Sequence, residues 1–556
     1  MPILNVITAN IASYLPAIAE QQPETWAVIV QPKSRQAKVN YDQAFTYQQL
    51  NEESDRIANG LLANGIKKGT RIVLMVKPGL EFFSLVFAIF KIEAVLVAID
   101  PGMGIKNLGK CLEEAEPEAF IGIPAAHIAR VVLRWGKDTI KQNILVGENP
   151  MLSLFMPTLD QIKKHASDQN YHAHDTSPDD TAAILFTSGS TGIPKGVVYN
   201  HANFTAQVET LKSLYNIQSG EVDLATFPLF ALFAPALGMT SVIPYMDFTR
   251  PGDVNPEKII DAVIDYQCTN MFGSPALLNR VGAQYKNIDI KLSCLKRVLS
   301  AGAPVSANIL KTYSKLVNDD VQIYTPYGAT ESLPVCSIGS HTIINETAIL
   351  TTQGKGVCVG KPVSNIDLIV IRITDDEIVN YDEAELLEKG EIGELCVRGP
   401  QVTSSYFNRS EQTKLAKIYD GNDFYHRMGD LGYLDDQGRV WFCGRKNHRV
   451  ETNDHVYYSD CVEGIFNTHP VVYRTALVGV IIQGYMTPVI CVELEQNHQQ
   501  DDFSEIQTAL LSIAQRHDMT KAISLFLPHA RFPVDIRHNA KINREQLAIW
   551  ASRQLS

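Results

Sequence analysis

A loop rich in glycine and hydroxyl side chains lies between two apolar, strand-like segments. Residues 187–196 read Thr-Ser-Gly-Ser-Thr-Gly-Ile-Pro-Lys-Gly, and the flanking segments are 182–186 and 197–199. Glycine lets the backbone turn sharply with its amide groups pointing inward, and the Ser and Thr hydroxyls add donors for oxyanions. Lys195 adds a positive charge. This pattern predicts a site for a polyphosphate.

The spacing of this loop excludes the two common nucleotide-binding motifs. It matches neither G-x-x-x-x-G-K-[ST] nor G-x-G-x-x-G. It also connects a strand to a strand, whereas both of those motifs connect a strand to a helix. A flexible Ser/Gly linker is the alternative interpretation, but a linker needs neither apolar strands on each side nor the Pro-Lys-Gly sequence. We therefore expect a different nucleotide-binding fold.

Short β-rich runs alternate with amphipathic helical patterns in the first third of the chain. The spacing predicts strands at 71–76, 95–99, 119–123 and 143–146, and helices at 81–93 and 126–135. This order is typical of a mostly parallel sheet covered by helices, so the predicted fold class is α/β. The most apolar run, 82–99, carries Lys91 and Glu93. These charges favour a buried helix–strand pair over a transmembrane span.

The pattern changes twice in the second half of the chain. From about 354 to 443, short strands and Gly-Asp turns predict a distorted antiparallel β-barrel or sheet. After 444–447, helices and strands return and predict a small α+β unit. We therefore predict an N-terminal domain over 1–443, a hinge at 444–447 and a mobile C-terminal lid domain over 448–556.

Composition excludes several functional classes. The chain has 49 Lys plus Arg against 61 Asp plus Glu, a net charge of −12, so nothing draws it to nucleic acid. Nine cysteines without a C-x-x-C pair indicate reduced thiols, and no basic and apolar leader opens the chain, so we predict a cytoplasmic protein. His165, His172 and His174 lie in a hydrophilic segment that predicts a solvated connector, so no metal is assigned to them.

Further motifs follow the glycine-rich loop. They are Tyr-Gly-Ala-Thr-Glu-Ser at 327–332, Gly-Glu-Ile-Gly-Glu-Leu at 390–395, His-Arg-Met-Gly-Asp-Leu-Gly at 426–432 and Gly-Arg at 444–445. With these motifs the chain resembles, over nearly its whole length, the adenylate-forming superfamily of acyl-CoA synthetases, peptide-synthetase adenylation domains and luciferases. The resemblance implies that a carboxylate attacks the α-phosphorus of ATP, releases pyrophosphate and becomes an acyl-adenylate.

The resemblance also implies which residues bind the nucleotide. Those expected at the β- and γ-phosphates are Thr187, Ser188, Gly189, Ser190 and Thr191. Thr330 would contact the α-phosphate region, and Glu331 would help to hold Mg²⁺. The expected adenine contacts are Gly302, Ala303 and Pro304, with the ring of Tyr327, and the expected ribose contacts are Asp430 and Arg445.

Two lysines complete the implied catalytic set with Thr330 and Glu331. Lys541, in the closing segment 532–542, would bridge ATP and the carboxylate, and Lys195 belongs to the phosphate loop. Ala540 stands where the family usually has glycine, so a solvated surface position is the alternative for Lys541. Core packing is the alternative for Tyr327, and turn capping is the alternative for Asp430.

The hinge region departs from the members that transfer the acyl group to CoA. The usual glycine is Asp454, the usual lysine is Glu451 and the hinge acid is Asn447. A side chain and a negative charge on the path of a thiol cofactor argue against CoA as the acceptor. With the segments 272–280, 325–334 and 537–541, these departures look like the β-lactone synthetases of bacterial long-chain olefin biosynthesis.

In that subfamily the 3-hydroxyl of a 2-alkyl-3-hydroxy fatty acid displaces AMP and closes a four-membered lactone, so no external acceptor is needed. The resemblance therefore implies ATP, Mg²⁺, a long-chain 3-hydroxy acid and olefin-pathway enzymes as possible partners. His201 and His538 are candidates for the base that takes the hydroxyl proton. The apolar stretch 227–239, with Ala231 where many relatives carry a bulky group, predicts either a wall of the acyl site or a buried helix.

Two other functions are open at the level of the sequence. A long-chain fatty acyl-CoA ligase, or an acyl-AMP ligase that loads a carrier protein, would share the first step, and consumption of CoA with a plain fatty acid would favour it. A non-catalytic nucleotide- or acyl-binding protein is the alternative from another class. The presence of Lys195, Glu331, Asp430 and Lys541 counts against it.

Overall fold

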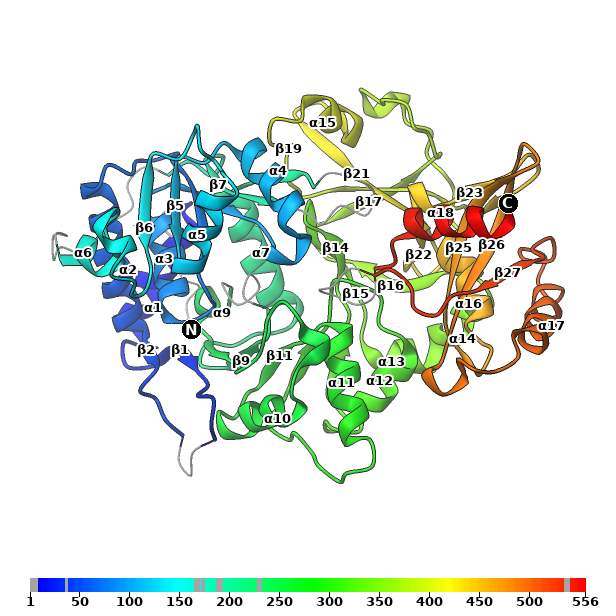
Figure 1. The fold of residues 1–556 in the computed structure, drawn as a ribbon, viewed down its shortest axis with the longest axis horizontal. Coiled ribbons are helices and arrows are strands. Elements are labelled where there is room, and N and C mark those ends of the chain that lie inside the picture. Colours follow the sequence, from blue (N-terminus) through cyan, green and yellow to red (C-terminus); the bar gives the residue numbers. More distant parts are fainter. Residues whose placement is uncertain are drawn as a thin grey trace.

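The computed structural model describes residues 9–35, 39–164, 171, 176–186, 194–227, 233–534 and 541–556. These residues form three large sheets and two small ones, with helices packed around them (Figure 1). The predicted α/β fold class is confirmed. Within the described residues, none of the helices combines the length and apolar character needed to cross a bilayer.

The first sheet is mostly parallel, as the alternation of strands and helices predicts. Its strands, in spatial order, are β19 (Ser405–Tyr406), β8 (Gly196–Asn200), β7 (Thr181–Phe186), β4 (Val95–Ala98), β3 (Arg71–Met75), β5 (Ala119–Gly122) and β6 (Gln142–Leu145). From β7 to β6 all neighbours are parallel, whereas β8 runs antiparallel to β7. The glycine-rich loop therefore joins two antiparallel neighbours, which confirms the predicted strand-to-strand connection.

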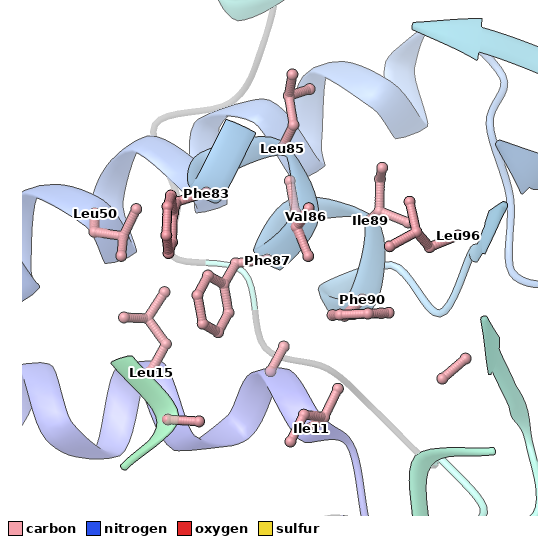
Figure 2. Packing of buried hydrophobic residues seen from close by; sticks show 14 of the residues in the cluster. Ile11, Leu15, Leu50, Phe83, Leu85, Val86, Phe87, Ile89, Phe90 and Leu96 are labelled. Carbon is pink, nitrogen blue, oxygen red and sulfur yellow. The ribbon is translucent and has the colours of Figure 1, made fainter. Parts of the chain in front are cut away.

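Helices of the N-terminal part pack around this sheet. They are α1 (Tyr14–Gln21), α2 (Tyr47–Ala63), α3 (Leu80–Lys91), α4 (Ile105–Ala115), α5 (Pro124–Val132) and α6 (Leu159–Lys164). Helix α3 is buried along nearly its whole length because its apolar residues leave no polar face. Figure 2 shows Phe83 and Phe87 of this helix beside Leu15 of α1 and Leu50 of α2.

The two charges in the apolar run 82–99 are buried with partners. Lys91 Nζ lies 2.5 Å from a carboxylate oxygen of Asp55 on α2. Glu93, directly after the helix, lies 2.5 Å from Lys68 Nζ. A buried charge is tolerated only when it is paired and hydrogen-bonded. The prediction of a buried helix–strand pair in place of a membrane span is thereby confirmed.

The second sheet carries the strands that lead into the candidate site. Its strands, in spatial order, are β13 (Gln322–Tyr324), β12 (Arg297–Leu299), β11 (Asn270–Phe272), β9 (Val222–Ala225), β10 (Thr240–Ile243), β1 (Trp26–Val30) and β2 (Ala44–Thr46). All neighbours except β1 and β2 are parallel. Parallel strands end at one edge of a sheet, so the segments that follow β11, β12 and β13 lie together.

Helices from the middle of the chain accompany the second sheet. They are α7 (His201–Leu214), α9 (Phe233–Ala236), α10 (Pro256–Asp265), α11 (Pro275–Tyr285) and α12 (Ala307–Ser314). Helix α7 begins with a capping box: the Asn200 side chain accepts from the Asn203 N–H, and the Asn203 side chain accepts from the Asn200 N–H. The helix therefore starts immediately after β8.

The third sheet is antiparallel. Its path runs through β14 (Tyr327–Ala329), β15 (Ser332–Ser337), β16 (Val357–Pro362), β22 (Val440–Arg445), β21 (Asp423–Leu434), β18 (Gly393–Arg398) and β17 (Asp367–Ile371), and β20 (Lys417–Asp420) pairs with β21. The associated helices are α13 (Ser340–Thr342), α14 (Ala348–Thr351) and α15 (Ser410–Ala416). The sheet starts at Tyr327, before the expected start near 354, because the hairpin of β14 and β15 pairs with β16.

The C-terminal unit contains a small three-stranded sheet with helices. Its elements are β23 (Val450–Glu451), β24 (Val456–Tyr457), α16 (Ser459–Phe466), β25 (Val472–Ile482), β26 (Tyr485–Leu494), α17 (Phe503–Ala514), β27 (Leu525–Pro528) and α18 (Arg544–Leu555). Figure 1 shows this unit, in orange and red, at the opposite end of the molecule from the first sheet. Its helix α16 packs closely on β22: a Cβ added to Gly444 would lie 2.2 Å from Ser459 Oγ.

Candidate active site

The predicted site residues fall into two groups. Thr187, Ser188, Gly189, Ser190 and Thr191 lie outside the described residues, as do His538 and the three histidines at 165, 172 and 174. The rest are described. They are Lys195, Gly302, Ala303, Pro304, Tyr327, Thr330, Glu331, Asp430, Arg445 and Lys541. Lys195 directly precedes β8 of the first sheet, and the others come from the second sheet's edge, the third sheet and the C-terminal unit.

Tyr327, Asp430 and Arg445 meet on the third sheet. The Tyr327 hydroxyl donates to Asp430 Oδ2 at 2.6 Å. Asp430 on β21 and Arg445 on β22 are direct cross-strand partners, and Arg445 Nη1 lies 2.9 Å from Asp430 Oδ1. The Tyr327 ring also contacts Phe442, with centroids 6.1 Å apart. Tyr327 is thus brought together with Asp430 and Arg445, which lie more than a hundred positions later in the chain.

Asp430 is buried with one acceptor still available. Its Oδ1 forms an ion pair with Arg445 Nη1 at 2.9 Å but receives no hydrogen bond of good geometry from the described residues. Burial raises the pKa of Asp430, and the charge of Arg445 opposes that shift. A buried acceptor without a donor is costly to a protein on its own. The carboxylate can therefore accept hydroxyl groups of a ligand.

Thr330 and Glu331 occupy the turn between β14 and β15, since Ala329 pairs with Ser332. The Thr330 carbonyl accepts from the Tyr199 hydroxyl. The Glu331 carbonyl accepts from both the N–H (2.9 Å) and the hydroxyl (3.2 Å) of Thr403. The turn is thus fastened to β8 on one side and to the segment before β19 on the other.

The Glu331 carboxylate faces a tyrosine that the sequence did not single out. Tyr406 on β19 donates its hydroxyl to Glu331 Oε1 at 2.8 Å. Lys195 Nζ lies over the ring of Tyr406, 4.8 Å from the centroid. Burial lowers the pKa of Lys195, and the charge of Glu331 opposes this. The phosphate-loop lysine and the predicted metal carboxylate therefore flank one aromatic ring.

Two further buried groups lie behind this ring, and the sequence pattern missed both. Lys417 on β20 and His426 on β21 are cross-strand partners. His426 contacts the edge of the Tyr406 ring, with centroids 6.4 Å apart. Both strands contain further charged residues, so no local pattern distinguishes Lys417 and His426 as site residues.

The segment after β12 offers backbone to a flat ligand. Gly302 and Pro304 are exposed, Ala303 is partly exposed, and Gly302 has a φ of 98°. That φ lies in the left-handed region, which glycine adopts without steric cost. The geometry fits the predicted contact between this segment and an aromatic base.

Glu331 is the one carboxylate that the sequence predicts as a metal ligand. The described residues contain no group of three or more His, Cys, Asp or Glu that could hold a metal. Mg²⁺ is commonly bound by one or two carboxylates together with substrate phosphates and water. A single carboxylate therefore fits Mg²⁺ bound together with a triphosphate better than a metal that requires a closed set of protein ligands.

Lys541 is exposed and lies on a segment that returns to helix α16. Directly after it, Ile542 bridges to Val534. Arg544 Nη2 lies 2.6 and 2.7 Å from the two carboxylate oxygens of Glu463 on α16. Because α16 packs on Gly444 beside Arg445, the segment of Lys541 is tied to the same side of the molecule as the Asp430 group.

An apolar cavity lies between α7 and the second sheet. Its apolar lining includes Leu211, Phe233, Leu237, Met239 and Leu299. Three of these belong to the predicted wall 227–239, whose residues 228–232, Ala231 included, lie outside the described part of the chain.

Polar residues also line this cavity, among them the pair Asp223 and Asn270. Asp223 accepts from the side-chain amide of the opposing Asn270. Burial raises the pKa of Asp223 to about 7. The cavity therefore suits an apolar chain, with a polar pair at one side.

His201 lies in the core. Its ring is fully buried, its Nδ1 accepts from the Ile11 N–H at 3.3 Å, and it contacts the ring of Phe90. Burial lowers the pKa of His201 to about 4. None of the contacts found for it involves the Glu331 or Asp430 group, so the structure does not support the hypothesis that His201 is the base.

Comparison with known proteins gives consistent matches. Residues 15–407 match the family described as AMP-binding enzyme. The protein named olefin beta-lactone synthetase from Xanthomonas campestris pv. campestris is 47% identical over 552 residues, which cover 98% of each chain. The protein of the same name from Stenotrophomonas maltophilia is 46% identical, again over 98% of each chain.

Among solved structures, ATP-bound MatB from Rhodopseudomonas palustris has a TM-score of 0.78 at 19% identity. The match covers 99% of this chain and 100% of that chain. At this level of identity the likeness establishes the fold alone, and it extends through the C-terminal unit.

Proposed function

Since this chain belongs to the AMP-binding enzyme family, we propose that it activates a long-chain 2-alkyl-3-hydroxy fatty acid with ATP and closes it to a β-lactone. The observation that carries the proposal is the 47% identity, across 98% of both chains, to a protein named olefin beta-lactone synthetase. Identity at this level extends over both the nucleotide-binding part and the C-terminal unit, where the acceptor preference of such enzymes is expected to lie.

In the first step, a carboxylate oxygen of the acid attacks the α-phosphorus of ATP. The bond to the bridging oxygen breaks, pyrophosphate leaves, and the acid becomes a mixed anhydride with AMP. In the second step, the 3-hydroxyl oxygen attacks the acyl carbon, loses its proton, and AMP leaves with the former carboxylate oxygen. An internal nucleophile has a high effective concentration, so no external acceptor is required.

The nucleotide is assigned to the residues grouped above. We assign the β- and γ-phosphates to Thr187, Ser188, Gly189, Ser190 and Thr191 with Lys195, and the α-phosphate region to Thr330. The segment Gly302, Ala303 and Pro304 and the ring of Tyr327 would border the adenine. The available oxygen of Asp430 supports its role toward the ribose hydroxyls, with Arg445 keeping the carboxylate ionised.

Glu331 would hold Mg²⁺, which supplies charge neutralisation for the triphosphate when it is bound. The Tyr406 hydroxyl orients the Glu331 carboxylate. Lys541 would place its ammonium between the two anionic substrates once the C-terminal unit is closed on them.

The apolar cavity beside α7 is the proposed site of the acyl chain. Leu211, Leu237 and Leu299 contribute apolar surface, and the second sheet's edge leads from there to the nucleotide segment after β12. Burying an alkyl chain contributes about 0.8 kcal/mol for each methylene group, so binding should strengthen with chain length until the cavity is filled.

The departures in the hinge region support a reaction without CoA. Asp454 and Glu451 are exposed at the turn between β23 and β24, so a negatively charged surface replaces the glycine-containing path of thiol-transferring members. We further propose that the enzyme works in the cytoplasm alongside other olefin-pathway enzymes. All nine cysteines are free thiols, which supports a reducing compartment.

The test combines the protein with ATP, Mg²⁺ and 2-alkyl-3-hydroxy acids, with and without CoA, and identifies the products by mass spectrometry and NMR. The proposal expects a β-lactone, AMP and pyrophosphate in the absence of CoA. A thioester that forms only with CoA would establish the acyl-CoA ligase instead. If no acid leads to pyrophosphate release, the result would support the alternative of a non-catalytic binding protein.

A further inference from the structure

A lysine without an acidic partner is buried behind the Glu331 turn. Lys417 on β20 is 2% exposed. Its Nζ donates to the Thr403 carbonyl and lies 4.5 Å from the ring centroid of Phe424. In the described part of the chain, no Asp or Glu forms an ion pair with it.

Such a position is unfavourable for folding. Removing an ammonium group from water costs several kcal/mol unless a counter-ion compensates. Burial lowers the pKa of Lys417 to about 7, and the charge of Glu331 partly opposes this. By contrast, Lys91, which is also buried, has Asp55 at 2.5 Å. The described residues provide no counter-ion that offsets the burial of the Lys417 ammonium group, and this points to a functional role for the residue.

The first link from Lys417 to Glu331 runs through one residue. Thr403 accepts from Lys417 through its carbonyl oxygen. The same residue donates its N–H (2.9 Å) and its hydroxyl (3.2 Å) to the Glu331 carbonyl. Lys417 therefore holds Thr403 in place, and Thr403 in turn holds the main chain of Glu331.

The second link runs through the side chains. His426 pairs with Lys417 across the strands and packs against Tyr406, whose hydroxyl donates to the Glu331 carboxylate at 2.8 Å. Lys195 lies over the same tyrosine ring. The main chain of Glu331 is thus held by Thr403, which contacts Lys417. The carboxylate of Glu331 is held by Tyr406, which packs against His426, the cross-strand partner of Lys417.

We propose that Lys417 is a positioning residue that holds Glu331 for the magnesium-bound triphosphate and adds buried positive charge behind it. This inference rests on the proposed function, because it assigns the role of Lys417 in the same nucleotide site. Its contacts keep the glutamate turn in one orientation, and in its protonated form its charge acts with those of Lys195 and Arg445 on the polyanion.

The test uses Lys417→Met, which keeps the length of the side chain and removes its charge. We expect the melting temperature to stay the same or to rise, because a buried charge has been replaced by an apolar group. At the same time, the Mg²⁺ concentration for half-maximal pyrophosphate release should rise about tenfold or more. Calorimetric titration with ATP and Mg²⁺ should show a parallel loss of affinity.

Two comparison variants separate positioning from general damage. Lys91→Met removes the other buried lysine and should lower stability without changing the Mg²⁺ requirement. Lys417→Gln keeps a donor for the Thr403 carbonyl and should recover part of the Mg²⁺ response, since it restores the contact without the charge.

The outcomes are distinguishable. If Lys417→Met keeps the wild-type Mg²⁺ requirement and ATP affinity, or if both Lys417 variants fail to fold, the positioning role is overturned. If the wild-type protein releases no pyrophosphate with any acid, the proposed function fails, and with it the basis of this inference.

Discussion

The hydroxyl of Tyr327 donates a 2.6 Å hydrogen bond to the carboxylate of Asp430, which joins the first strand of the antiparallel sheet to its longest strand. This bond uses Oδ2, and Oδ1 forms an ion pair with Arg445 Nη1 at 2.9 Å. A carboxylate fixed in this way is oriented before a ligand arrives, so little side-chain entropy is lost when hydroxyl groups bind to it.

Asp430→Ala should abolish ATP-dependent pyrophosphate release and leave the fold intact. The change removes the acceptor proposed for the ribose, while the strands on both sides keep their backbone hydrogen bonds. Pyrophosphate release and the far-ultraviolet circular dichroism spectrum are the two measurements. Normal activity would remove Asp430 from the site.

Tyr327→Phe tests the orienting bond separately. The ring and its contact with Phe442 are retained, and only the hydrogen bond to Asp430 is lost. A hydrogen bond to a charged group contributes about 1.5 kcal/mol or more, so ATP should bind roughly tenfold more weakly. Equilibrium titration with ATP measures this, and an unchanged dissociation constant would contradict the orienting role.

Leu211→Trp should shorten the acyl chains that the enzyme accepts. Leu211 on α7 lines the apolar cavity, and a bulkier ring there takes up space that an alkyl chain would fill. We expect kcat/KM to fall for long 3-hydroxy acids and to change little for short ones. Leu62→Trp, on an exposed part of α2, is the matched control. An equal effect on acids of all chain lengths would show that the acyl chain does not bind in this cavity.

Lys91→Met should lower the free energy of unfolding by about 3–5 kcal/mol, because it leaves the buried Asp55 carboxylate without its ammonium group. The double variant Lys91→Met, Asp55→Leu should recover at least half of this loss, since both charges are then absent. Urea unfolding of the single and double variants gives the comparison. A double variant no more stable than Lys91→Met would show that packing, and not the charge, dominates.

Elements with strong local patterns were predicted closely from the sequence. The strands β3, β4 and β5 lie within a residue or two of the predicted runs, because a parallel strand buried on both faces is a short apolar segment bounded by turn residues. The apolar runs on both sides of the glycine-rich loop predict the connection from β7 to β8, and the charges of Lys91 and Glu93 favour a buried helix–strand pair, as the structure has it.

Residues that depend on long-range pairing could not be predicted in this way. Tyr406 reaches Glu331 because β19 pairs with β8 of the first sheet, which joins segments about two hundred positions apart. Lys417 and His426 reach the same ring through β20 and β21. Hydrophobic periodicity describes one element at a time, so it carries no information about which strands become neighbours.

Gly444→Ala should disturb the contact between the C-terminal unit and β22. Gly444 has a φ of 130°, and an added Cβ would lie 2.2 Å from Ser459 Oγ on α16. The Ser459 side chain must rotate or helix α16 must shift, so pyrophosphate release should fall and limited proteolysis near the hinge should accelerate. Gly438→Ala is the matched control, since Gly438 has a φ of 72° with no atom within 4 Å of an added Cβ. If both variants show the same change in pyrophosphate release and proteolysis, backbone strain alone would explain the effect of Gly444→Ala.

His201→Asn should flatten the loss of stability in acid. Burial lowers the pKa of His201 from 6.5 to about 4, so between these values the unfolded chain binds a proton that the folded chain does not. Stability therefore falls as the pH drops through this window, by roughly 3 kcal/mol at most. Asparagine can still accept from the Ile11 N–H but does not titrate. Urea unfolding at pH 7 and pH 4.5 measures the difference. His455→Asn, on an exposed turn, is the control. Parallel pH profiles for wild type and His201→Asn would refute the prediction.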